Sequence, residues 1–123
     1  TYKTEILDHG VLQYADSKNE EPYAYYYWIF PNIMLNFYAW GVSVNIVEPL
    51  SMNKTRIKFL TFSQPNQDLT NLINELHQVE LEDEEVVLNV QKGINSKTYS
   101  KGRYSVNHEK GVHYFHRLLS NYI

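Results

Sequence analysis

The spacing of apolar residues changes once along the chain, near Ser63, and this change constrains the fold more than any other feature. Before it, Val42–Val47 and Thr55–Phe62 alternate apolar and polar residues with the period of two that half-buried strands show, and a turn at Glu48–Lys54 would join them into a hairpin. After it, the apolar residues from Leu69 to Ile94 recur at helical spacing. Strands followed by helices indicate an α+β domain, with helices packed on an antiparallel sheet.

The remaining elements follow from residue types. Aromatic and β-branched residues fill 23–38, and Pro31, which has no donor for a sheet ladder, marks a bend between two strands there. Gly10–Ala15 is expected to be a strand, followed by a loop over the polar residues 16–22. A last helix is predicted over 109–121. We therefore expect one domain that spans residues 1–123.

The composition excludes several classes of protein. Apolar residues make up 43% and charged residues 20%, which suits a chain that buries a core. The net charge of −3 argues against a nucleic-acid-binding surface, which needs clustered Lys and Arg. No run of eighteen apolar residues is present, so no membrane span is expected, and we predict a cytoplasmic protein. The absence of cysteine excludes disulfides and an iron–sulfur cluster within this chain.

One carboxylate of the predicted long helix falls among its apolar residues. At about 100° per residue, Asp83 lies roughly 20° from the centre of the stripe that is marked by Val90, whereas Glu82, Glu84 and Glu85 lie well outside it. A buried carboxylate must be protonated, paired with a cation or bound to a metal. An Arg or Tyr partner, a kink that exposes Asp83, and a metal ion all fit this pattern, and the spacing leaves them open.

Other chemical candidates are weaker. His113 and His116 lie three apart on the predicted last helix, so both could face one way and help to bind a metal. No third ligand is near them in sequence, and packing or surface histidines are the favoured interpretation. No Ser-His-Asp order, phosphate-binding glycine loop or catalytic carboxylate pair is present.

Several blocks of sequence together resemble one family. Glu82-Asp83, Val86-Val87 and Gln91-Lys92-Gly93 resemble the Glu-Asp, Val-Val and Gln-x-Gly motif in the large subunits of Rieske-type non-haem iron oxygenases. Block 26–38, which contains Tyr-Tyr-Trp-Ile-Phe-Pro-Asn, and the blocks 40–45, 102–105 and 111–119 are similar to further family signatures in the same order. The similarity covers nearly the whole chain, as the C-terminal part of the catalytic domain, and is greatest to oxygenases of aromatic acids and of choline- or betaine-like ammonium compounds.

The resemblance implies a helix-grip (START-like) fold, in which a curved antiparallel sheet wraps a long helix around a hydrophobic cavity. It also implies that Asp83 is the carboxylate of a two-histidine, one-carboxylate Fe(II) site. The family's Rieske domain holds a [2Fe–2S] cluster on two Cys and two His, and that domain is absent here, as are the two iron-binding histidines. We therefore expect a piece of a longer protein which, taken alone, binds no iron tightly and is inactive.

The implied activity is insertion of oxygen from O2 into an aromatic or quaternary-ammonium small molecule. Electrons would come from NAD(P)H through a reductase or ferredoxin, and the full-length protein would be a homotrimer. A substrate cavity would be lined by some of Tyr25, Tyr27, Met34, Asn36 and Tyr38, with the inward set of alternate residues left open. Two alternatives remain, which are a non-catalytic carrier of a hydrophobic ligand and an oligomerisation piece.

Overall fold

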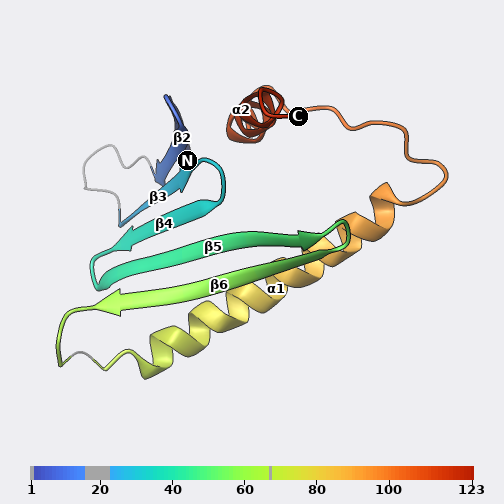
Figure 1. The fold of residues 1–123 in the computed structure, drawn as a ribbon. Coiled ribbons are helices and arrows are strands. Elements are labelled where there is room, and N and C mark those ends of the chain that lie inside the picture. The colour runs from blue at the N-terminus through green and yellow to red at the C-terminus, as the bar shows by residue number, and fades with distance from the viewer. Residues whose placement is uncertain (1, 16–22, 67) are drawn as a thin grey trace. The chain divides into compact units, whose positions relative to one another are not determined.

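The computed structural model describes residues 2–15, 23–66 and 68–123, which form two compact units. One unit is Thr1–Gln64 with Tyr104–Ile123, and the other is Pro65–Arg103. The first carries the whole sheet and the short last helix, and the second carries the long helix (Figure 1). The loop predicted over 16–22 lies outside the described residues, and the expectation of a single domain stays a prediction.

Six strands form one antiparallel sheet in which each strand pairs with the next along the chain (Figure 1). They are β1 Tyr2–Leu7, β2 Gly10–Ala15, β3 Ala24–Ile29, β4 Ile33–Tyr38, β5 Gly41–Ser51 and β6 Lys54–Ser63. The helices are α1 Thr70–Ile94 and α2 Lys110–Leu119. The α+β class is confirmed, and the curved sheet with two helices is consistent with a helix-grip fold.

Two details of the sheet differ from the sequence prediction. β1 was not predicted, because it is an edge strand whose residues are exposed apart from half-buried Thr4, so it shows no apolar alternation. The predicted turn at Glu48–Lys54 is wrong in extent, since β5 continues to Ser51 and only Met52 and Asn53 link it to β6. Pro49 is tolerated in β5 because β4 pairs with that strand only as far as Ile46.

Helix α2 lies against one face of the sheet. The register places Val11 opposite Trp28 and Trp28 opposite Met34, so these side chains share that face. Gly111 of α2 approaches so closely that an added Cβ would meet Val11 Cγ1 at 3.4 Å. The Tyr114 hydroxyl of α2 also donates to the carbonyl oxygen of Asp8 at 2.7 Å. The predicted last helix is confirmed, and its contacts hold it at the β1–β2 end of the sheet.

Asp68 lies just before helix α1 and hydrogen-bonds to its first residue. The Asp68 carboxylate accepts hydrogen bonds from the Thr70 backbone N–H at 3.0 Å and from the Thr70 hydroxyl at 2.7 Å. Both hydrogen bonds lower the pKa of Asp68 below its usual value, and the bond from the backbone N–H has the larger effect. The 25-residue helix has no buried residue. Among the described residues, no helix is both long and apolar enough to cross a membrane.

Gly41→Ala is expected to reduce the free energy of unfolding by roughly 2–3 kcal/mol. Gly41 has φ +153°, and an added Cβ would lie 2.1 Å from the backbone oxygen of Phe62 on the neighbouring strand. Urea unfolding followed by circular dichroism measures the loss. The matched control is Gly93→Ala, where nothing lies within 4 Å of the new Cβ and helix propensity favours alanine. An unchanged unfolding midpoint for Gly41→Ala would contradict the close β5–β6 approach.

Candidate functional site

A cavity of about 940 Å³ lies in the first unit, between the α2-bearing face of the sheet and α2. This volume suits a small organic ligand. Strands β1 to β6 all contribute to its wall, together with His108 before α2 and one side of α2 itself. Its main lining side chains are Val11, Tyr26, Trp28, Met34, Asn36, His108, Val112, Phe115 and Leu119. The cavity is therefore built from residues that lie up to about a hundred positions apart in sequence.

Two aromatic rings from different elements form the apolar wall. Trp28 of β3 and Phe115 of α2 meet edge to face, with ring centroids 5.2 Å apart and planes at 82°. Phe30, which follows β3, contacts Trp28 in the same manner at 6.1 Å. Edge-to-face aromatic pairs are worth about 0.5–1.5 kcal/mol beyond the area they bury. The wall is thus held in shape by ring contacts between the sheet and α2.

The polar side chains that line the cavity are amides, hydroxyls and one imidazole. Asn32 donates through Nδ2 to the carbonyl of Val47 at 2.9 Å, and Gln13 donates through Nε2 to Thr4 Oγ1 at 3.3 Å. Among the described residues that line the cavity, none is Lys, Arg, Asp or Glu. The site therefore offers aromatic faces and neutral hydrogen-bonding groups, with His108 as its single titratable imidazole.

Tyrosines cluster beside this wall. Tyr26 is half-buried and lies near Tyr2 and Tyr38, with ring centroids 6.3 and 6.0 Å away. Burial, before any neighbouring group, raises the pKa of the Tyr26 phenol far above its usual value, so this hydroxyl keeps its proton at neutral pH. Tyr38 in turn stacks on Trp40 at 5.0 Å. Tyr26 is the member of this cluster that borders the cavity.

Asp83 lies on α1, where the sequence places it, but it is exposed. The prediction that Asp83 is buried is wrong here, because the valines that share its stripe are also uncovered, with Val86 60% and Val90 58% exposed. Glu80, one turn earlier, is half-buried, and its pKa is raised first by burial and then by the charge of Asp83. Asp83 is therefore an accessible carboxylate beside a second acid.

The described residues do not build a complete iron site. No group of three His, Cys, Asp or Glu side chains among them is arranged to hold a metal ion. The accessible carboxylate of Asp83 suits one ligand position, and the two imidazoles of a two-histidine, one-carboxylate site would have to come from elsewhere. His113 and His116 both pack on Tyr104, whose hydroxyl hydrogen-bonds to His116 Nδ1.

The five predicted cavity residues do not share one face of the sheet. Met34 and Asn36 line the cavity, and Tyr38 is on the same face but lies in the tyrosine cluster instead. Tyr27 borders the cavity, yet its register opposite Leu35 and its ring contact with Phe37 place its ring on the other face. Tyr25, opposite Phe37, also lies on that other face.

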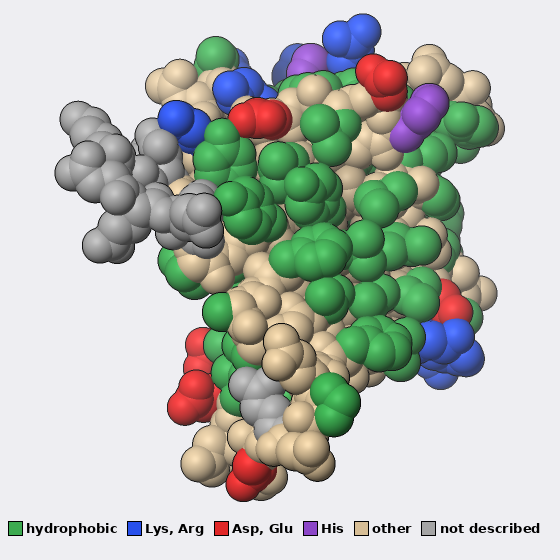
Figure 2. All heavy atoms as spheres, turned by 90° about the vertical axis from the view of Figure 1, so that its left-hand side faces the viewer, with side chains coloured by type: hydrophobic (Ala, Val, Ile, Leu, Met, Phe, Trp, Pro, Cys, Tyr) green, Lys and Arg blue, Asp and Glu red, His purple; other side chains and the backbone are tan. Residues whose placement is uncertain are grey.

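Exposed apolar side chains are plentiful on the sheet. Tyr25 is 37% exposed, Phe37 39% and Phe62 58%. Figure 2 shows hydrophobic side chains gathered over a broad area of the side of the molecule that it presents. Tyrosine side chains therefore lie on both faces of the sheet, and the register of the strands determines which of them reach the cavity.

Sequence reasoning missed the residues that complete the cavity. Trp28 lies on the same face of β3 as Tyr26, and Phe115 lies on the apolar side of α2. The alternation of residues along β3, taken together with the apolar pattern of α2, could have indicated that Trp28 and Phe115 meet. His108 gave no usable signal, because it lies in a turn before α2 and no local period applies there. The sequence predictions did not show which side chains from distant segments meet in the folded chain.

Comparison with known proteins identifies the family. The model of the ring-hydroxylating alpha subunit (catalytic domain) matches residues 4–123, almost the whole chain. The chain belongs to this family of ring-hydroxylating oxygenase alpha subunits. The resemblance to the catalytic domain of Rieske non-haem iron oxygenases is thereby confirmed. No solved structure matches this chain.

The curated proteins that this chain is similar to include plant choline monooxygenases. The chloroplastic enzyme of Arabidopsis thaliana is 35% identical over 101 residues, which cover 78% of this chain and 24% of the relative. Those of Amaranthus tricolor and Beta vulgaris are each 28% identical over 134 positions, covering 97% of this chain and 30% of the relative. The chain thus spans less than a third of their length. Their chloroplastic location differs from the cytoplasmic one that we predicted.

Proposed function

We propose that this chain is the substrate-holding segment of a Rieske-type oxygenase that inserts oxygen from O2 into a small quaternary-ammonium alcohol of the choline class. The observation that carries the proposal is the aromatic wall of the cavity, where Trp28, Phe115 and Tyr26 present ring surfaces. A quaternary ammonium group is attracted to the faces of such rings, most strongly to tryptophan. The similarity to choline monooxygenases supports the same class of substrate.

The charge of the cavity favours a cationic substrate over an aromatic acid. A carboxylate ligand is usually held by Arg or Lys, which form short charge-assisted hydrogen bonds with it. The described lining residues include neither. A trimethylammonium group cannot donate hydrogen bonds, so it loses little in a wall without acceptors. The neutral donors of Gln13 and Asn36 are suited to orient the hydroxyl at the other end of such a molecule.

We propose that Asp83 supplies the carboxylate ligand of the iron in the full-length protein. Its exposure supports this role, because a ligand that joins histidines from another segment must be accessible. When bound, Fe(II) in such a site supplies the open positions at which dioxygen is activated. The remaining machinery proposed for the full-length protein is a [2Fe–2S] Rieske domain, an NAD(P)H-dependent reductase or ferredoxin as electron donor, and a homotrimeric assembly.

The decisive experiment uses the full-length, iron-loaded protein with an electron donor. Choline is expected to be consumed together with O2 and to bind at least about 10-fold more tightly than its uncharged isostere 3,3-dimethylbutan-1-ol. Benzoate, as the aromatic-acid comparison, is expected to bind weakly and not to be oxidised. Equal affinity for choline and the isostere would contradict the cation-binding wall.

A non-catalytic carrier is the competing function, and the same cavity supports it because its lining is mostly apolar. The two functions differ in what happens to a bound ligand. A carrier would release choline or an apolar compound unchanged from the iron-loaded, reduced protein in the presence of O2. Tight binding of the uncharged isostere with no product would therefore favour the carrier over the oxygenase.

A further inference from the structure

The geometry points to Tyr122 as a positioning residue, whose ring acts through Phe30 to hold Trp28 and Phe115 at the spacing that ligand binding needs. Tyr122 itself does not border the cavity, whereas Trp28 and Phe115 both do. The inference relies on the proposed function only for the class of ligand. The arrangement of the rings stands independently of it.

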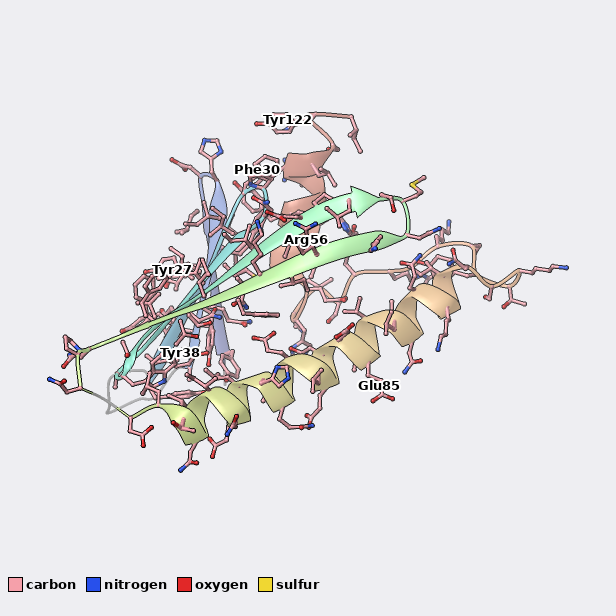
Figure 3. The ribbon with its side chains drawn as sticks, turned by 60° about the horizontal axis from the view of Figure 1, so that its bottom comes forward. Tyr27, Phe30, Tyr38, Arg56, Glu85 and Tyr122 are labelled. Carbon is pink, nitrogen blue, oxygen red and sulfur yellow. The ribbon has the colours of Figure 1, made fainter. Side chains whose placement is uncertain are left out.

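Four rings form a continuous series from the cavity wall outward. Phe115 contacts Trp28 at 5.2 Å, Trp28 contacts Phe30 at 6.1 Å, and Phe30 stacks on Tyr122 at 5.2 Å with planes only 24° apart. Figure 3 shows Phe30 and Tyr122 lying next to one another at the end of α2. Two of the rings come from β3 and the turn after it, and two come from α2 and the residues that follow it.

The series joins two separate connections between the sheet and the C-terminal segment. Phe115 lies within α2, and Tyr122 lies beyond its end, where the Tyr122 N–H donates to the Leu119 carbonyl at 3.0 Å. Leu119 also lines the cavity. If the Phe30–Tyr122 stack were lost, the segment after α2 would lose this ring contact with the sheet side, and Phe115 would remain as the ring contact of α2 with Trp28. The inner rings would then have more freedom to move apart.

The contacts also say what each substitution removes. Tyr122 is 70% exposed, so truncating it opens no buried void and should leave the fold intact. Among the contacts of the described residues, none involves the Tyr122 hydroxyl, so Tyr122→Phe retains the stacking ring. Tyr99 is a matched control, since it is a 48% exposed tyrosine that belongs to the other unit.

The test measures Trp28 directly in the full-length protein labelled with 5-fluorotryptophan. Its ¹⁹F resonance is assigned from the signal that disappears in Trp28→Phe. Tyr122→Ala is expected to shift or broaden this resonance without ligand, whereas Tyr122→Phe and Tyr99→Ala leave it unchanged. With choline, Tyr122→Ala should raise KM and Kd about 3- to 10-fold with kcat unchanged, as loss of one aromatic contact predicts.

The positioning role of Tyr122 and the class of ligand would be refuted by different results. A Trp28 resonance that is unchanged in Tyr122→Ala would overturn the positioning role, whatever ligand the protein binds. A Trp28 resonance that moves in a protein that binds neither choline nor tetramethylammonium would retain the positioning role and refute the proposed ligand class. A resonance that moves equally in Tyr122→Phe would also overturn the proposal, because the ring would then not be the group responsible.

Discussion

Asp83→Ala in the full-length protein is expected to abolish stoichiometric iron binding and substrate turnover while the fold stays intact. A facial site with one carboxylate has no substitute ligand when that carboxylate is removed, and second acids such as Glu80 lie a helical turn away. The fold should survive because Asp83 is exposed and buries no surface. Iron content by metal analysis, turnover and the circular dichroism spectrum check the three parts of this result.

Glu85→Ala is the matched control for Asp83→Ala. Glu85 is an exposed acid on the same helix, two residues further along, and it is labelled on α1 in Figure 3. This variant is expected to retain the iron content and activity of the unsubstituted protein. Full iron occupancy in Asp83→Ala would refute its assignment as the ligand, and equal iron loss in both variants would indicate a general effect of charge on α1.

Trp28→Ala is expected to weaken choline binding about 100-fold, the largest effect of any cavity substitution. It removes the ring with the strongest attraction for an ammonium group and breaks the contacts with Phe115 and Phe30 together. Isothermal titration calorimetry with choline measures the loss. Trp28→Phe keeps a ring in the wall and is expected to stay within about 10-fold of the original affinity.

The control for Trp28→Ala is the same change at the other tryptophan of this chain. Trp40 stacks on Tyr38 and does not border the cavity, so Trp40→Ala removes an equally large ring without touching the proposed site. Its choline affinity should remain close to that of the unsubstituted protein. Choline affinity that survives in Trp28→Ala would show that the ammonium group binds somewhere other than this wall.

Local periodicity predicted several elements of the fold because burial on one face imposes a repeat. It identified β5, β6, α1 and the change of class near Ser63, while residue types indicated β2, β3 and β4. It missed β1, since an exposed edge strand has no buried face to impose a pattern. The predicted strand ended at Val47, before Pro49, whereas β5 continues to Ser51, because a proline is excluded only where a second neighbouring strand needs its N–H.

The site was less accessible to sequence reasoning, because it depends on register and on partners far away in the chain. A shift of one residue across the turn between β3 and β4 decides whether Tyr27 or Trp28 lies opposite Met34, and so which ring reaches the cavity. The stripe containing Asp83 was placed correctly on α1, but a stripe does not say what covers it. A side chain on a helix is buried only where a second element covers it, and the spacing of residues along one helix does not show whether such an element is present.

Gly111 sets how closely α2 can approach β2 at one side of the cavity. Because Gly111 has no side chain, the backbone of α2 lies close to the methyl groups of Val11 at this point. Gly111 and Val11 both border the cavity. The depth available to a guest molecule is therefore set by how far one helix stands from one strand. A methyl group in place of this hydrogen would lie in van der Waals contact with Val11, so the gap holds an alanine, whereas a larger side chain at position 111 would push the helix away from the strand and deepen the space for a guest molecule.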